Sequence, residues 1–228
     1  HRGYTYSYDY ENRLTKIQDG ANVVAEYDYD ALGRRIRKID HAAGVTTLYY
    51  YNQNWQTLCE TDKNDVVQRC YIYGNFIDEP LIMTDSDDHY YVHDHLYSTA
   101  ALLDEDGSVL ERYEYDAYGR LHFYNAGFNL LATQESAHNN SLLFTSRPTD
   151  LLDDGEMPLQ DNRWRILDFA TGRWLQRDPL GVTPNGYLGN GRFSPIAQYT
   201  DGMNAYEYCL LYTSPSPRDR TRSRMPSS

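Results

Sequence analysis

Four residues in the last quarter of the chain form its best candidate for chemistry. Two aspartates, Asp178 and Asp201, lie near two arginines, Arg173 and Arg177, in the sequence. Two carboxyl groups held side by side share a proton, so one can activate water while its protonated partner polarises a carbonyl group. A neighbouring arginine would keep one of them ionised. The competing interpretation is structural, because both aspartates occur in Asp-Pro or Asp-Gly pairs, which commonly form turns.

Two cysteines form a second candidate for chemistry. Cys59 and Cys70 flank a polar stretch, residues 62–65, that is typical of a turn. Across a hairpin they would be close enough for a disulfide if the register is right. A slip of one residue would place them on opposite faces of the sheet. We favour two reduced, half-buried cysteines and leave the bridge open as the alternative.

The composition indicates an all-β protein rich in amphipathic aromatic residues. The 228 residues include 23 tyrosines but only 6 phenylalanines and 4 methionines, and the mean hydropathy is −0.74. Tyrosine favours the pleated, half-exposed surfaces of sheets. The net charge of −12 argues against nucleic-acid binding, which needs an excess of lysine and arginine. No apolar stretch approaches the roughly 18 residues that would span a bilayer.

An internal repeat of about 21 residues runs through the first half of the chain. The segments YSYDYENRL, YDYDALGRR, YYYNQNWQT, YIYGNFIDE, YVHDHLYST and YEYDAYGRL align on a tyrosine, once a histidine, followed by Asp, Asn or Gly. The anchor residues, at spacings of 21, 22, 22, 20 and 22, are Tyr8, Tyr29, Tyr51, Tyr73, His93 and Tyr115. A fixed period of this length indicates a repeat architecture.

Each repeat predicts two strands and two turns. The Y-x-Y alternation places two aromatic rings on one face of a strand. The D-x-x-G that follows at residues 30–33 and 116–119 suits a tight turn, because Asp accepts backbone hydrogen bonds and Gly tolerates positive φ. Asn12 can take the Gly role at residues 9–12. We therefore predict consecutive antiparallel hairpins over residues 4–124, paired into one continuous sheet without a long helix.

Two further clusters allow a binding function, and each has a structural alternative. His93 and His95 could present two imidazoles on one strand face near His89, an arrangement compatible with a metal ion. Because His93 occupies a repeat anchor, we favour a structural role and predict no metal and no cofactor. The tyrosine ladder could stack on sugar rings, but cross-strand packing, worth about 0.2–1 kcal/mol per pair, explains the same pattern.

The repeat resembles the YD repeats of the RHS family, which also includes Tc-toxin C subunits and teneurins. The signature YxYDxxGR covers residues 4–124, and four ordered motifs cover residues 91–208. VHDHLYSTAALLDEDGSVLERYEYDAYGR is similar to the family's DHLGS segment, LLFTSRPTD to FTGRxxD, NRWRILDFATGRWLQRDPLG to RxYDPxxGRFLxxDPxG, and DGMNAYEY to DGxNxYxY. One departure is the long stretch GVTPNGYLGNGRFSPIAQY between Asp178 and Asp201.

The resemblance implies a strip of β-sheet that spirals into a hollow shell, closed at one end by the core motif. A variable C-terminal segment, often a toxin or effector, follows the core and is enclosed. Some members release that segment by an intramolecular aspartyl cleavage with the Asp of the DP motif, the Asp of DGxN and a core Arg. These roles would fall to Asp178, Asp201 and either Arg173 or Arg177. The resemblance also implies a secreted or cell-surface location.

We divide the chain into four parts on this basis. Residues 1–124 are YD repeats, 125–150 a connecting insertion, 151–208 the RHS-associated core of mostly β and irregular structure, and 209–228 a tail. The tail, CLLYTSPSPRDRTRSRMPSS, drops the tyrosine pattern, and one codon choice for it resembles a sequencing adapter. A Pro/Ser/Arg-rich disordered tail is the alternative. Because HRGY at the start has no initiator Met or signal-peptide pattern, we expect the natural protein to extend beyond both ends.

Three functions remain in view from the sequence. The first is a structural shell segment that encloses or presents the protein's own C-terminal cargo. The second is an aspartyl self-peptidase that acts once, within the intact protein. The third is a surface module that binds polysaccharide.

Overall fold

The computed structural model describes residues 3–179, 206 and 208. Asp201 and the tail at 209–228 lie outside these described residues. The strands of the repeat region are β1 (Tyr4–Tyr8), β2 (Leu14–Asp19), β3 (Asn22–Tyr29), β4 (Arg35–Asp40), β5 (Val45–Tyr51), β6 (Thr57–Thr61), β7 (Val67–Tyr73), β8 (Pro80–Thr84), β9 (Asp88–His93), β10 (Thr99–Leu103), β11 (Val109–Tyr115) and β12 (Leu121–Asn125). The later elements are the short 3-10 helix η1 (Phe144–Ser146), β13 (Thr149–Leu152), β14 (Met157–Asp161), β15 (Ile166–Asp168) and β16 (Arg173–Trp174).

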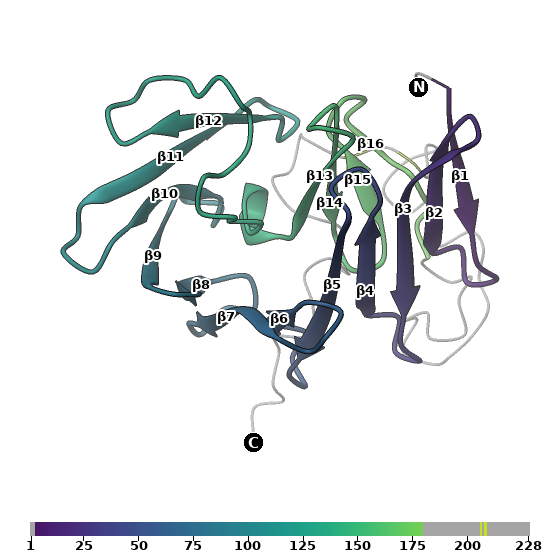
Figure 1. The fold of residues 1–228 in the computed structure, drawn as a ribbon, viewed down its shortest axis with the longest axis horizontal. Helices are drawn as coiled ribbons and strands as arrows, with labels where there is room; N and C mark the ends of the chain where they lie inside the picture. The colour runs from purple at the N-terminus through teal and green to yellow at the C-terminus, as the bar shows by residue number, and fades with distance from the viewer. Residues whose placement is uncertain (1–2, 180–205, 207, 209–228) are drawn as a thin grey trace.

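The repeats form one antiparallel sheet in which the strand order equals the sequence order. Its twelve strands run β1 to β12, and each pairs with the strand before it. The sheet curves strongly, so that β1 and β12 lie at opposite ends of an open arc (Figure 1). The all-β fold and the consecutive hairpins predicted from the repeat are confirmed. The boundaries proposed at residues 124 and 150 stay predictions.

The turns have the chemistry that the repeat predicted. In the turns that begin at Asp9, Asp30 and Asp116, the aspartate Oδ1 accepts the backbone N–H groups two and four residues later. The fourth residue has positive φ, with values of 62° at Asn12 and 85° at Gly33. Such turns close hairpins with a bulge at the strand end, which matches the register shift between Asp28 and Tyr29 in the β3–β4 pair.

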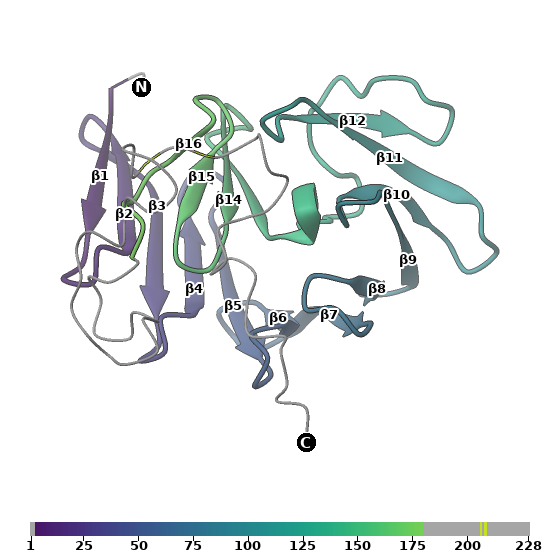
Figure 2. The same cartoon turned by 180° about the vertical axis from the view of Figure 1, so that it is seen from behind.

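A second sheet, made of β13 to β16, packs on the inner face of the first. We call residues 142–176, which contain this sheet and η1, the closing segment. One apolar cluster joins Leu14 and Ile17 of β2 to Leu159 of β14, and a second joins Phe123 of β12 to Phe144 of η1. Both views place η1 inside the arc, between its two arms (Figures 1 and 2). The closing segment therefore fills the curve that the repeats build.

The tyrosine ladder faces this core. The first tyrosine of each Y-x-Y pair is at most 9% exposed, namely Tyr27, Tyr49, Tyr71, Tyr91 and Tyr113. The second tyrosine is half-buried, and at Tyr29, Tyr51 and Tyr115 its hydroxyl donates to a backbone carbonyl near the start of the neighbouring strand. Burial raises the pKa of these phenols, so the rings pack as neutral, hydrogen-bonded aromatic groups.

Candidate functional site

Asp178 lies just after β16 and is held by an arginine that the sequence analysis did not select. Its Oδ2 lies 3.2 Å from Nη1 of Arg165, the residue that precedes β15. Arg165 is 5% exposed, and its guanidinium lies over the Trp174 ring at 4.1 Å from the centroid. The carboxylate is thus anchored to the closing segment by a buried cation that is itself fixed by packing.

Arg177 connects this place to a residue far along the chain. Its Nε donates to the Tyr206 hydroxyl at 3.0 Å, and the Trp174 N–H donates to the Tyr206 carbonyl at 3.1 Å. The chain therefore returns to the Asp178 region at Tyr206, five residues after Asp201. Because Asp201 is outside the described residues, the predicted pair of aspartates stays a prediction.

Arg173 has a different setting from the one expected for a catalytic partner. It is an exposed residue of β16, opposite Asp168 in the register with β15. Arg165 could have been found from the sequence, since it stands at the first Arg of the RxYDP-like motif in RILDF. The spacing to Asp178 did not indicate it, because the two residues meet only when β15 and β16 pair.

A first buried charge cluster joins the closing segment to β4. Asp150 of β13 pairs with Arg35 and, at 3.0 Å, with Lys38, while Asp161 of β14 lies 3.2 Å from Arg35 Nε. The side chains of Arg35 and Asp150 are 1% and 3% exposed. Burial alone would raise the pKa of Asp150, but the two cations outweigh it and lower that pKa to about 2.

A second buried charge cluster has the opposite polarity. Asp78, in the loop between β7 and β8, pairs with Arg147 at 3.2 Å and also with Arg163. Here the sheet supplies the anion and the closing segment supplies the cations. Arg147 and Asp150 both belong to the motif LLFTSRPTD, which the sequence analysis used only to identify the family.

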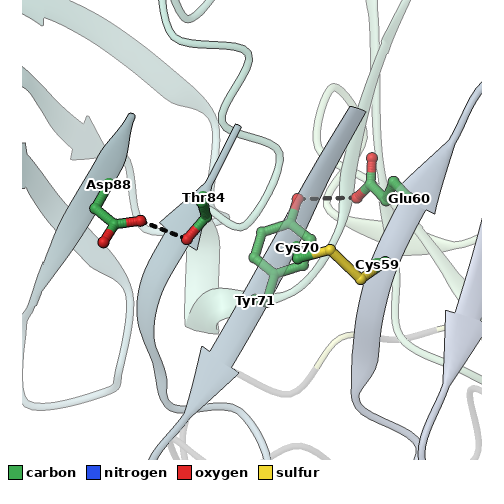
Figure 3. The surroundings of a disulfide bond; sticks show 6 residues. All are labelled: Cys59, Glu60, Cys70, Tyr71, Thr84 and Asp88. Atoms are coloured by element: carbon green, nitrogen blue, oxygen red, sulfur yellow. Dashed lines mark hydrogen bonds between the residues drawn. A yellow bond between two sulfur atoms is a disulfide. The ribbon is translucent and has the colours of Figure 1, made fainter. Parts of the chain in front are cut away.

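The cysteines correct one prediction. Cys59 of β6 and Cys70 of β7 are directly opposite each other in the register and form a disulfide, whereas we favoured two reduced thiols (Figure 3). The strand neighbours Glu60 and Tyr71 point to the inner face, where the tyrosine hydroxyl donates to the carboxylate at 2.9 Å. The bridge therefore lies on the outer face. Sequence alone left the register undecided, and the register determines whether the two sulfur atoms meet.

The histidines do not share a strand face. β9 ends at His93, so His95 lies in the following turn, and the expected i, i+2 pair on one strand is wrong. His93 stacks on Tyr91 with ring centroids 5.8 Å apart, and burial lowers its pKa. His89 instead lies 3.3 Å from Asp85 and packs against His138. These contacts are those of packed aromatic residues.

The family model that describes the teneurin YD-shell matches residues 1–131, more than half of the chain. The chain belongs to this YD-shell family. It is thus an RHS-type, YD-repeat protein, and this part of it is a structural shell segment.

Relatives within and around the YD-shell family agree with this assignment. The tRNA3(Ser)-specific nuclease WapA of Bacillus spizizenii is 32% identical over 119 residues, which cover 51% of this chain. Teneurin-3 of Danio rerio is 22% identical over 213 residues, or 88% of this chain. The solved pore structure of the Photorhabdus luminescens Tc holotoxin covers 99% of this chain with a TM-score of 0.64 and 18% identity. The crystal structure of TcdB2-TccC3 covers 91% with a TM-score of 0.59 and 18% identity.

This YD-shell chain is short compared with those proteins. It spans 5% of the length of the Bacillus relative, 8% of the teneurin and 10% of the chains in both solved structures. Among the residues that the structure describes, no helix is long and apolar enough to cross a membrane.

Proposed function

We propose that this chain is the closing end of a YD shell that encloses or presents the protein's own C-terminal segment. The observation that carries the proposal is the placement of the closing segment on the inner face of the curved sheet, through two apolar clusters and two buried charge clusters. A shell wall with its inner face filled at this point has a closed end here. The chain after residue 176 leaves from that inner side, which suits an enclosed segment.

Protease protection in the intact protein tests the enclosure. We expect the segment that follows the core to resist a nonspecific protease in the wild type and to be cut in Asp150→Ala, which leaves Arg35 and Lys38 buried without their anion. Asp28→Ala is the matched control, because Asp28 pairs with Arg37 on the outer face, where both side chains are nearly half exposed. A C-terminal segment that is digested equally in all three proteins contradicts the proposal.

We infer a second activity, self-cleavage of the intact protein with Asp178 and Asp201 as the two carboxyl groups. Its support is the return of the chain at Tyr206 to Trp174 and Arg177, on both sides of which lie the predicted catalytic residues. Five residues of extended chain reach at most about 17 Å, so Asp201 can come within reach of Asp178. One carboxylate would then activate water while its protonated partner polarises the peptide carbonyl.

A denaturing gel of the intact protein tests self-cleavage. The wild type should give two bands, while Asp178→Asn and Asp201→Asn should each give one. Asp106→Asn, in an exposed turn of the repeats, is the control and should cleave like the wild type. An uncut wild type, or cleavage in both variants, leaves these aspartates with a turn-forming role only.

We also propose an extracellular or cell-surface location. The Cys59–Cys70 disulfide supports it, since such bridges persist mainly in oxidising compartments. Polysaccharide remains a proposed partner at the outer tyrosines alone, because the ladder tyrosines are buried while Tyr10 and Tyr50 are 91% and 47% exposed. Alkylation of the protein from its natural source, without reduction, should leave both cysteines unmodified.

A further inference from the structure

The inner face of the sheet is repetitive, so apolar packing alone offers the closing segment several equivalent positions. Each unit presents a buried tyrosine at the same place in its odd-numbered strand, from Tyr27 to Tyr113. The units follow one another every two strands, or roughly 10 Å along the sheet. A closing segment shifted by one unit would meet nearly the same aromatic surface.

One unit departs from this pattern. The first residue of every even-numbered strand of the sheet is buried, and these residues are Leu14, Arg35, Thr57, Pro80, Thr99 and Leu121. Arg35 is the charged member of that set. Lys38 stands in β4 where β2, β8 and β10 have Ile17, Met83 and Leu102, each 0% exposed. Two cations therefore interrupt an otherwise mostly apolar row at β4.

The closing segment carries the complementary charges at this place. Asp150 and Asp161 meet the cations of β4, and Arg147 and Arg163 meet Asp78 three strands further along the sheet. The two clusters have opposite polarity. A shift by one unit would leave charges of the closing segment buried against apolar side chains, which costs far more than a lost surface ion pair.

We propose that these two buried charge clusters determine which unit of the repetitive sheet the closing segment docks on. They act as specificity determinants and contribute little net stability, because the desolvation of buried charges offsets most of their attraction. The proposal rests on the closing role proposed above and names the residues that position the closure. It matters most in a long strip, where many units offer similar inner surfaces.

Spin-label distance measurements on this chain test the proposal. Labels at two exposed positions, through Lys63→Cys on the sheet and Ala170→Cys on the closing segment, report their separation. The test variant replaces the first cluster by apolar or neutral groups: Arg35→Met, Lys38→Met, Asp150→Leu and Asp161→Asn. The control, Arg37→Met with Asp28→Leu, removes an ion pair on the outer face of the same strands.

The wild type and the control should each show one narrow distance. The test variant should keep its folded circular-dichroism spectrum but show at least a tenfold rise in the ratio of displaced to native distances, with displaced values about 10 Å away. Asp150→Asn keeps the volume of the side chain and serves where the fourfold variant does not fold. It should show the displaced population as well.

The outcomes separate this inference from the proposed function. A narrow wild-type distance that stays narrow in both test variants overturns the specificity role and leaves the closing role intact. A broad wild-type distribution overturns both, since the closing segment then has no fixed place on the sheet. Equal broadening in the test variant and the outer-face control also overturns the specificity role.

Discussion

The two rims of the twelve-stranded sheet use the same turn chemistry in different surroundings. Gly119, on the rim that touches the closing segment, has φ of +84°, and an added Cβ would lie 2.6 Å from Phe144 and 2.7 Å from Phe169. Gly107, on the opposite rim, has φ of +80° with nothing within 4 Å of the same point. The D-x-x-G signature therefore meets one requirement on the open rim and two on the covered rim.

The two faces of the sheet differ in the same way. The ion pair of Arg35 with Asp150 on the inner face is almost fully buried, whereas that of Arg37 with Asp28 on the outer face is 44% and 49% exposed. These arginines are two residues apart on one strand. The closing segment, and not the local sequence, sets what each side chain contributes.

The largest effect should come from breaking the inner pair. Asp150→Ala should lower the free energy of unfolding by roughly 3–5 kcal/mol, because two buried cations lose their partner. Asp28→Ala should cost less than about 1 kcal/mol. Denaturant unfolding of both variants measures the difference, and equal losses would contradict the contrast between the faces.

The rims should differ by the cost of overpacking. Gly119→Ala should lower the free energy of unfolding by about 3 kcal/mol, from backbone strain at positive φ plus contact with two phenylalanine rings. Gly107→Ala carries the strain alone and should lose about 1–2 kcal/mol. Thermal or denaturant unfolding checks this, and a Gly107→Ala loss as large as that of Gly119→Ala would show that the closing segment yields at the rim.

Acid should weaken the covered side specifically. The pKa of Asp150 is lowered to about 2 in the folded protein, so its ionised form stabilises the fold above pH 4. That contribution, about 2 kcal/mol, should be lost as the pH falls from about 4 towards 2. Unfolding measured across this range should show a shallower pH dependence in Asp150→Asn than in the wild type. Parallel curves would assign the acid sensitivity to other carboxylates.

The smallest difference concerns single tyrosine hydroxyls. Tyr29→Phe removes a hydrogen bond of 2.7 Å to the Leu14 carbonyl on the inner face and should cost about 1 kcal/mol. Tyr50→Phe removes a bond of 2.9 Å to Asp65 on the outer face, where water replaces the partner. Its unfolding midpoint should stay within error of the wild type, and a loss equal to that of Tyr29→Phe would contradict the comparison.

The sequence predicted what depends on neighbouring residues and missed what depends on the contact between distant strands. Asp30 and Gly33 announce their turn because both act within five residues. Trp55 and Tyr97 take the same positive φ, at 66° and 63°, without any local signal, since the flanking strands impose the hairpin. The Arg165 partner of Asp178 was missed for the related reason that it depends on the pairing of β15 with β16.

The consecutive strand order has a consequence for synthesis. Each hairpin of the sheet can pair as soon as it leaves the ribosome, because every strand bonds to the one made just before it. The closing segment is made only after all twelve strands. Until then Met83, Leu102 and Phe123, which are 0% exposed in the finished fold, line an uncovered inner face. The nascent chain thus passes through a stage in which a long apolar trough is open to other proteins, and this is the stage at which a chaperone or a misassembled partner would act.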